Sequence, residues 1–356
     1  MTFLRRHWTV IFVACVPIAA ILELVAPERE IAIFVASGIA IVPLAAYIGR
    51  ATDTLAQRFG GGIGGLLNAT FGNAAELIIG VIALRRGFTD LVKASLTGSI
   101  IGNILLVFGL CTFVGGLRHP VQRFNRTAAG LGSTMLLLSA IGLTVPAVFH
   151  QLSRGGAGTE LRLDTEIAVV LLLTYLASLV FTLKTHRSEY TTGVVEHAEG
   201  SQVWPAVAVL VGATAGVAWM SELLVGTVST AAEQFGMSDL FVGVVVVAVI
   251  GNAAEHFSAV MMAWKNQMDA AISIAVGSSI QIALFVAPVL VFASYAIAPA
   301  PMNLLFSVFE VVAVGLAVLS ITTIAHDGET HWMEGVQLLA VYVILALGFY
   351  FLPTHG

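Results

Sequence analysis

Two copies of the five-residue motif GNAAE occur 179 residues apart in this chain, each inside a long apolar segment. Each copy carries a carboxylate, Glu76 or Glu255, and an amide three residues earlier, Asn73 or Asn252. Side chains three residues apart share one face of a helix, so each copy places an amide beside a carboxylate. Ionisable side chains inside membrane segments are energetically costly and mark ion or proton pathways.

Further polar side chains recur in the apolar segment that follows each motif, within the strings GSIIGN and GSSIQ. Ser99 and Asn103 are four residues apart, Ser278 and Gln281 are three apart, and each pair forms one polar helix face. Carboxylate, amide and hydroxyl oxygens are the ligands that Ca²⁺ prefers. No cysteine or paired histidine stands beside them, which disfavours zinc and copper.

The central turns of these four segments hold no Lys or Arg that could neutralise the carboxylates. The partner must then be a cation from solution or a proton, because an unpaired buried charge is strongly disfavoured. Two close carboxylates also repel each other, which favours proton uptake by at least one. One Ca²⁺ or two protons would cancel both charges, whereas an empty, charged site would resist crossing the membrane. The plainer interpretation is that these groups only join helices by hydrogen bonds.

The composition is that of a membrane protein. Hydrophobic residues make up 58% of the chain and charged residues 10%, against roughly 25% charged in soluble domains. The apolar residues form runs long enough for bilayer-spanning helices, so we predict an all-α polytopic protein whose partner is the lipid bilayer. The net charge of -5 is mild, and nucleic acid is not an expected partner.

We predict about eleven transmembrane helices, which places the two termini on opposite sides of the membrane. They lie at 8–26, 30–49, 62–85, 92–117, 125–150, 163–184, 202–222, 238–264, 269–294, 303–325 and 334–352. Ten of the 16 Lys and Arg residues fall on the side of the N-terminus, so we expect a cytoplasmic N-terminus and an outside C-terminus.

The two halves of the chain match at a constant offset. Gly64 matches Gly243 and Asp90 matches Asp269, at the same spacing of 179 residues that relates the two motifs. We therefore predict two five-helix repeats, at 30–184 and 202–352, with an extra N-terminal helix at 8–26 and a linker at 185–201. Five helices is an odd number, so the second repeat enters the membrane inverted, as in many secondary transporters. The two motifs would then meet near the midplane.

The strings GGLLNATFGNAAELIIG and VGVVVVAVIGNAAEHFSAV, with GSIIGN and GSSIQIALF, resemble the two signature repeats of the calcium/proton exchangers. That family lies within the calcium/cation antiporter superfamily, and the resemblance covers nearly the whole chain. It implies that Glu76 and Glu255 bind Ca²⁺ and carry the exchanged protons, with Ca²⁺ as substrate and no cofactor. It also implies a polar role for Asn73, Asn252, Ser99, Ser278 and Gln281.

The sequence departs from the family pattern at one position, and the family pattern points to two further acidic residues. Family exchangers usually carry a polar residue where Gly102 stands. The resemblance leaves open whether the neighbouring Asn103 supplies the ligand that is missing there. The family also has an acidic residue ahead of each signature helix, which implies that Asp53 and Glu233 admit or gate the cation. A solvated loop carboxylate is the alternative for Asp53.

Other polar positions have less specific interpretations. His256 could tune Glu255 or relay protons, but a packed or hydrogen-bonded histidine is at least as good an explanation. For Glu310 we expect a hydrogen bond in the bundle interior. We interpret the acidic and histidine-rich segment at 326–334 as a surface loop rather than a metal site.

Several alternatives to a Ca²⁺/H⁺ antiporter remain at this point. A sodium-coupled calcium exchanger would commonly need a further acidic residue where this chain has Ser, Gly and Gln. An intramembrane metalloprotease would need a motif such as HExxH, which is absent, so we do not expect an enzyme. A passive channel fits less well than a carrier. The short loops favour a prokaryotic plasma membrane, and the sequence allows a homo-oligomer.

Overall fold

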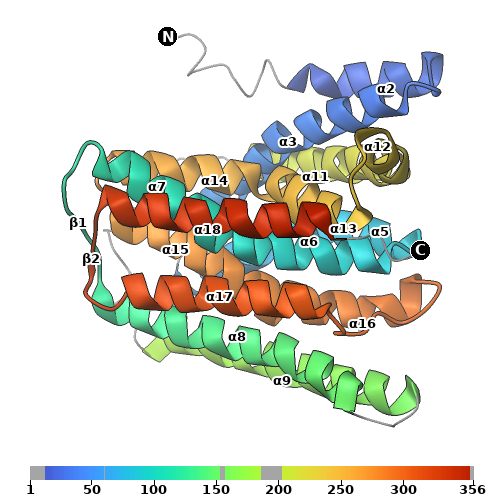
Figure 1. Cartoon of the computed structure of the whole chain (residues 1–356). Coiled ribbons are helices and arrows are strands. Elements are labelled where there is room, and N and C mark those ends of the chain that lie inside the picture. Colours follow the sequence, from blue (N-terminus) through green and yellow to red (C-terminus); the bar gives the residue numbers. More distant parts are fainter. Residues whose placement is uncertain (1–12, 60, 153–156, 186–202, 353–356) are drawn as a thin grey trace.

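The computed structural model describes residues 13–59, 61–152, 157–185 and 203–352. These residues form a bundle of helices joined by short connections (Figure 1). The α-helices are Cys15–Val25 (α2), Glu30–Phe59 (α3), Gly61–Phe71 (α4), Ala74–Arg85 (α5), Thr89–Ile101 (α6), Phe108–Gly116 (α7), Arg126–Leu152 (α8), Ala157–Val180 (α9), Val203–Gly226 (α11), Val228–Phe235 (α12), Asp239–Phe241 (α13), Ala248–Trp264 (α14), Met268–Gln281 (α15), Ala287–Ile297 (α16), Val308–Ile324 (α17) and Trp332–Phe351 (α18). The π-helical segments are Gly102–Val107 (η1), Phe181–Thr185 (η2), Val242–Val247 (η3) and Ile282–Val286 (η4), and the strands are Gln122–Arg123 (β1) and Glu329–Thr330 (β2).

The predicted all-α membrane fold is confirmed. Within the described residues, eight helical runs are long and apolar enough to cross a bilayer, and two shorter apolar helices, α2 and α17, accompany them. The broken pair α4 and α5 covers the predicted segment at 62–85. The count of eleven spans stays a prediction, as does the division into repeats. The start of the first predicted span and nearly all of the predicted linker lie outside the described residues.

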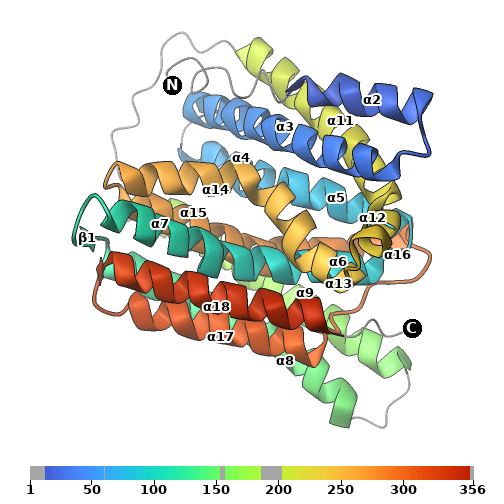
Figure 2. The same ribbon diagram turned by 45° about the horizontal axis from the view of Figure 1, so that its top comes forward.

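The two motif-bearing segments run in opposite directions. In Figure 2 the chain passes from α4 to α5 in one direction and from α13 to α14 in the other. Helices α6 and α15, which follow them, each continue into a π-helical segment, η1 after Ile101 and η4 after Gln281. Such segments shift the helix face by a fraction of a turn and are frequent at functional sites.

Several predicted boundaries were wrong, and two of them change the position of an acidic side chain. Helix α3 continues to Phe59 instead of ending at 49, so Asp53 is a helical residue and not a loop residue. Helix α17 begins only at Val308, whereas the prediction started at 303. Ser307 and Glu310 form a capping box that fixes this start, since each accepts a hydrogen bond from the other's backbone N–H. Glu310 therefore lies in the first turn of α17 rather than deep inside a span.

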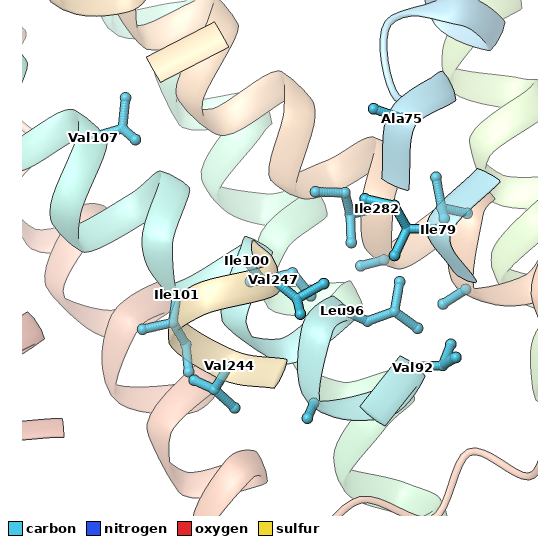
Figure 3. Packing of buried hydrophobic residues seen from close by; sticks show 14 of the residues in the cluster. Ala75, Ile79, Val92, Leu96, Ile100, Ile101, Val107, Val244, Val247 and Ile282 are labelled. Atoms are coloured by element: carbon cyan, nitrogen blue, oxygen red, sulfur yellow. The ribbon is translucent and has the colours of Figure 1, made fainter. Parts of the chain in front are cut away.

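The core lies where the motif-bearing segments cross the helices that follow them. Figure 3 shows Leu96 and Ile100 of α6, Val247 of η3 and Ile282 of η4 packed together, and the last three are at most 3% exposed. At the crossing of α6 and η3, a Cβ atom on Gly98 would overlap the backbone of Val244. Gly98 therefore permits the close backbone approach that brings the two halves together.

A short antiparallel pairing of β1 with β2 joins two distant connections at one end of the bundle (Figure 1). Arg123 and Glu329 are paired in register, and their side chains form an ion pair at 2.9 Å. Asp327 accepts a hydrogen bond from the Glu329 N–H at 3.1 Å, and Glu334 accepts one from the His331 N–H at 2.9 Å. These local bonds explain the polar residues at 326–334, and the described residues hold no group of three or more His, Cys, Asp or Glu side chains able to bind a metal.

Candidate cation site

The backbone presents the two motif glutamates differently. The first copy lies at a helix break, because α4 ends at Phe71 and α5 begins at Ala74. Glu76 therefore occupies the first turn of α5, where the helix dipole favours a negative charge. The second copy lies within the continuous helix α14, and Glu255 is in its middle.

The amides and hydroxyls of the two halves bind each other crosswise. Asn252 Nδ2 donates to Ser99 Oγ at 2.9 Å, and Ser278 Oγ donates to Asn73 Oδ1 at 3.1 Å. Each motif asparagine thus bonds the serine of the other half. Asn73 Nδ2 in turn donates to Gln281 Oε1. Four of these five side chains are no more than 5% exposed, and only Gln281 is partly exposed.

Asn103 lies at the centre of this network. Its Nδ2 donates to Ser278 Oγ at 3.1 Å and to Asn252 Oδ1 at 3.3 Å. Its Oδ1 lies 3.0 Å from His256 Nε2, which must carry the proton because Oδ1 can only accept. A Cβ on Gly102 would meet no atom within 4 Å, and the adjacent Asn103 provides the amide in this region. That Asn103 replaces the polar group usual at Gly102 stays a prediction. His256 is therefore a hydrogen-bonded histidine, and its proton-relay role stays a prediction.

Each of the two carboxylates keeps one oxygen that this network does not satisfy. Oε2 of Glu76 and Oε2 of Glu255 are both buried and have no hydrogen-bond partner within the described residues. A Cβ on Gly251 would lie 3.4 Å from Glu76 Cγ, so the first glutamate packs against the helix that carries the second. The two carboxyl groups interact electrostatically, and no described Lys or Arg forms an ion pair with either. Two buried, unpartnered carboxylate oxygens on groups that repel each other call for a cation or protons.

A cavity of about 710 Å³ leads to these groups from one end of the bundle. Glu255, Ser278 and Gln281 line its inner part, while Arg50, Asp53 and Lys265 also line it. Arg50 and Asp53 belong to the C-terminal part of α3, and Lys265 directly follows α14, so these three residues surround the outer part of the cavity. A hydrated ion can therefore reach Glu255 from this end, and Ala75, next to Glu76, also lines the cavity.

The structure brings together most of the residues predicted from sequence. Eight of them form the network and its two carboxylates: Asn73, Glu76, Ser99, Asn103, Asn252, Glu255, Ser278 and Gln281. Asp53 lines the cavity. It lies on α3 and not in the loop where the predicted boundaries put it. Glu233 lies apart, exposed on α12 at the opposite end of the bundle (Figure 1). Its gating role stays a prediction.

Asn68 lines the cavity but was not predicted from the sequence. Its carbonyl oxygen accepts a hydrogen bond from Gly72 N at 2.8 Å, which closes the last turn before the helix break. The signal was present, because Asn68 stands four residues before Gly72 and so shares its helix face.

Glu310 has the interior hydrogen bond expected of it. Its carboxylate is 4% exposed and accepts from Thr97 Oγ1 at 3.1 Å and from Ser307 N at 2.8 Å. This glutamate is therefore satisfied by protein donors, unlike Glu76 and Glu255. It serves as an internal comparison for them.

The sequence profile described as sodium/calcium exchanger protein matches residues 29–184 and 205–351. The chain belongs to this family. Within the sodium/calcium exchanger family, its relatives include a "Ca(2+)/H(+) antiporter" of Synechocystis sp., 47% identical over 91% of this chain and 92% of that protein. Another is the "Ca(2+)/H(+) antiporter ChaA" of Bacillus subtilis, 46% identical over 98% of this chain and 100% of that protein.

Solved structures of this exchanger family have the same fold. The structure of native YfkE is 46% identical and superposes with a TM-score of 0.84, over 97% of this chain and 100% of that one. The crystal structure of the H⁺/Ca²⁺ exchanger CAX is 15% identical with a TM-score of 0.73, over 97% of this chain and 92% of that one. At that identity the likeness shows the fold alone.

Proposed function

We propose that this chain exchanges Ca²⁺ for protons across a membrane by alternating access, with Glu76 and Glu255 near the midplane as shared ligands. The unpartnered buried oxygens of these two glutamates carry the proposal. Relatives that are 46–47% identical over most of the chain are named Ca²⁺/H⁺ antiporters, which supports the same ion pair here.

The network around the glutamates supports a site for one cation. The asparagine and serine side chains bond each other across the two halves, so they hold the surrounding oxygens in place without neutralising the carboxylates. A Ca²⁺ ion would take both carboxylates and nearby amide or hydroxyl oxygens. Two protons would cancel the same charge, so cation and protons compete for one site.

Exchange follows from this competition together with the cost of an empty site. With neither Ca²⁺ nor protons, two carboxylates would face each other in a low-dielectric interior, which opposes the passage between inward-open and outward-open states. The loaded forms lack this charge and can pass. Each passage of Ca²⁺ in one direction then requires a return loaded with protons.

The orientation belongs to the proposal. The Lys and Arg distribution favours a cytoplasmic N-terminus, and the cavity lined by Arg50 and Lys265 then faces the cytoplasm. We assign the structure to an inward-open state in a prokaryotic plasma membrane. Ca²⁺ and protons are the substrates, and no cofactor is assigned.

Uptake by proteoliposomes tests the proposal. Vesicles loaded at acidic pH and diluted into alkaline, Na⁺-free medium should take up ⁴⁵Ca²⁺, and collapsing the pH gradient should stop the uptake. Empty liposomes under the same gradient are the control. Uptake that requires a Na⁺ gradient and ignores the pH gradient would instead indicate a sodium-coupled exchanger.

A further inference from the structure

An ion pair joins a motif-bearing helix to α11 at the end of the bundle away from the cavity mouth. Arg86 Nε and Nη2 both bind Glu222 Oε1, at 2.9 and 2.5 Å. The side chains are 38% and 46% exposed. A Cβ on Gly226 would lie 2.8 Å from Arg86 Nη1, so this glycine leaves room for the guanidinium on α11. The pair therefore ties α5 to α11 at the end where α12 lies (Figure 2).

The sequence repeat gives Arg86 a counterpart at the other end. Adding the offset of 179 to Arg86 gives Lys265, and both residues are the C-caps of their motif-bearing helices, α5 and α14. The same offset of 179 residues makes α11 the repeat counterpart of α3. These two helices also pack against each other. On α3, Asp53 is the carboxylate that lines the same cavity as Lys265. The residue at the repeat position of Glu222 is Pro43, which precedes Asp53 on α3. The correspondence is therefore between helices and charges and not between single positions.

The two ends differ in whether their charges meet. Asp53 and Lys265 both line the cavity, yet no ion pair joins them within the described residues. At one end, a cation that caps a motif-bearing helix is paired with a carboxylate on the neighbouring helix. At the cavity end, Lys265 and Asp53 line the open cavity without forming an ion pair.

We propose that these two ion pairs form alternately and act as the gates of the exchanger. Arg86 and Glu222 hold the far end closed while the cavity is open, and Asp53 and Lys265 pair when the cavity closes. This assignment rests on the proposed alternating access. It makes Arg86, Glu222 and Lys265 positioning residues that set the balance between the two states without touching the transported ion.

Cross-linking tests the proposal directly. In a C15A/C111A background, the pair D53C/K265C is treated with a short bifunctional maleimide in full-length protein. Because the two positions approach each other when the cavity closes, cross-linking should be faster in the closed-cavity state. Adding E222Q should raise the cross-linking rate about two- to five-fold, the range of a partly exposed ion pair. R58Q, which neutralises an exposed charge on α3 outside the cavity lining, is the matched control and should leave the rate unchanged.

The reversed pair R86E/E222R should return the rate to that of the parent, because it restores the attraction with opposite signs. A failure of D53C and K265C to cross-link, or an unchanged rate with E222Q, would overturn the proposal. The readout does not depend on which ions are exchanged. If cross-linking behaves as expected but no proton-driven Ca²⁺ uptake is found, the proposed function is refuted. The proposal for the two gates would still stand.

Discussion

At the scale of single residues, the site contains two classes of side chain. One class is hydrogen-bonded within the protein, and the other keeps oxygens without a protein partner. The amides and hydroxyls of Asn73, Ser99, Asn252 and Ser278 are bonded to each other across the two halves. The glutamates retain buried oxygens without a protein partner. This division predicts different consequences for the two classes of residue.

Replacing either site glutamate by glutamine should abolish exchange. E76Q and E255Q each remove one of the two charges that balance Ca²⁺, so proton-driven ⁴⁵Ca²⁺ uptake in proteoliposomes should fall to the level of empty liposomes. E310Q is the matched control, because Glu310 is also an interior glutamate but is satisfied by Thr97 and Ser307. Near-normal uptake by either site variant would show that the assignment is wrong.

Removing the central amide should destabilise the protein as well as weaken Ca²⁺ binding. N103A leaves Asn252 Oδ1 and His256 Nε2 without their partner, which should cost about 1–3 kcal/mol. The thermal unfolding midpoint should fall in the variant. T112V, on the continuing helix, is the control, because the Thr112 hydroxyl donates only to its own helix at Phe108 O. Equal midpoints for N103A and the parent would contradict the network.

The sequence supplied the identities of the site residues but not their partners. Repetition and helical spacing selected Asn73, Asn252, Ser99 and Ser278. That each asparagine bonds the serine of the opposite half depends on how the helices cross, which spacing along one helix does not encode. The role of Asn103, which follows Gly102 in the sequence, was left open for the same reason.

At the scale of elements, the two halves are similar in order but not in detail. The first motif interrupts a helix between α4 and α5, whereas the second lies within α14. Gly98 and its repeat equivalent Gly277 also differ. A Cβ on Gly98 would overlap Val244, while one on Gly277 would meet nothing within 4 Å.

This difference predicts unequal effects of one substitution at equivalent positions. G98A should destabilise the fold by about 1–3 kcal/mol, because the added methyl forces α6 away from η3. G277A should be tolerated and serves as the matched control. Denaturation in detergent, followed by tryptophan fluorescence, measures both. A loss of stability in G277A equal to that in G98A would contradict the close crossing.

Helix boundaries were the least predictable feature at this scale. The predicted end at 49 treated Arg50, Asp53 and Arg58 as loop residues because they are charged. The helix continues to Phe59 since the segment ATDTLAQRF contains good helix formers and its polar face borders the cavity. Hydropathy reports where the lipid ends, and a helix need not end there.

At the scale of the whole molecule, the proposed gates and the cavity define two ends. The cavity is lined by residues of α3, α14 and α15 at one end, and α12 lies at the other (Figure 1). The opposite directions of the two motif-bearing segments were predictable from the odd number of helices expected per repeat. Which end is open could not be read from the sequence, because one chain encodes both states.

The two ends should be reachable from opposite sides of the membrane. In a C15A/C111A background, S258C in the cavity lining and E233C on α12 are both exposed in this structure. An impermeant maleimide should label E233C in intact cells and S258C only in inverted vesicles. Labelling of both from the same side would contradict the predicted topology.

The most direct test of the shared site is to count protons released when Ca²⁺ binds. Ca²⁺ added to purified protein in weakly buffered solution should displace protons from Glu76 and Glu255, so acidification should approach about two protons per Ca²⁺ at low pH. The apparent Ca²⁺ affinity should fall as the pH is lowered, and E76Q and E255Q should each reduce the release. Ca²⁺ binding that releases no protons at any pH, with an affinity independent of pH, would contradict the account.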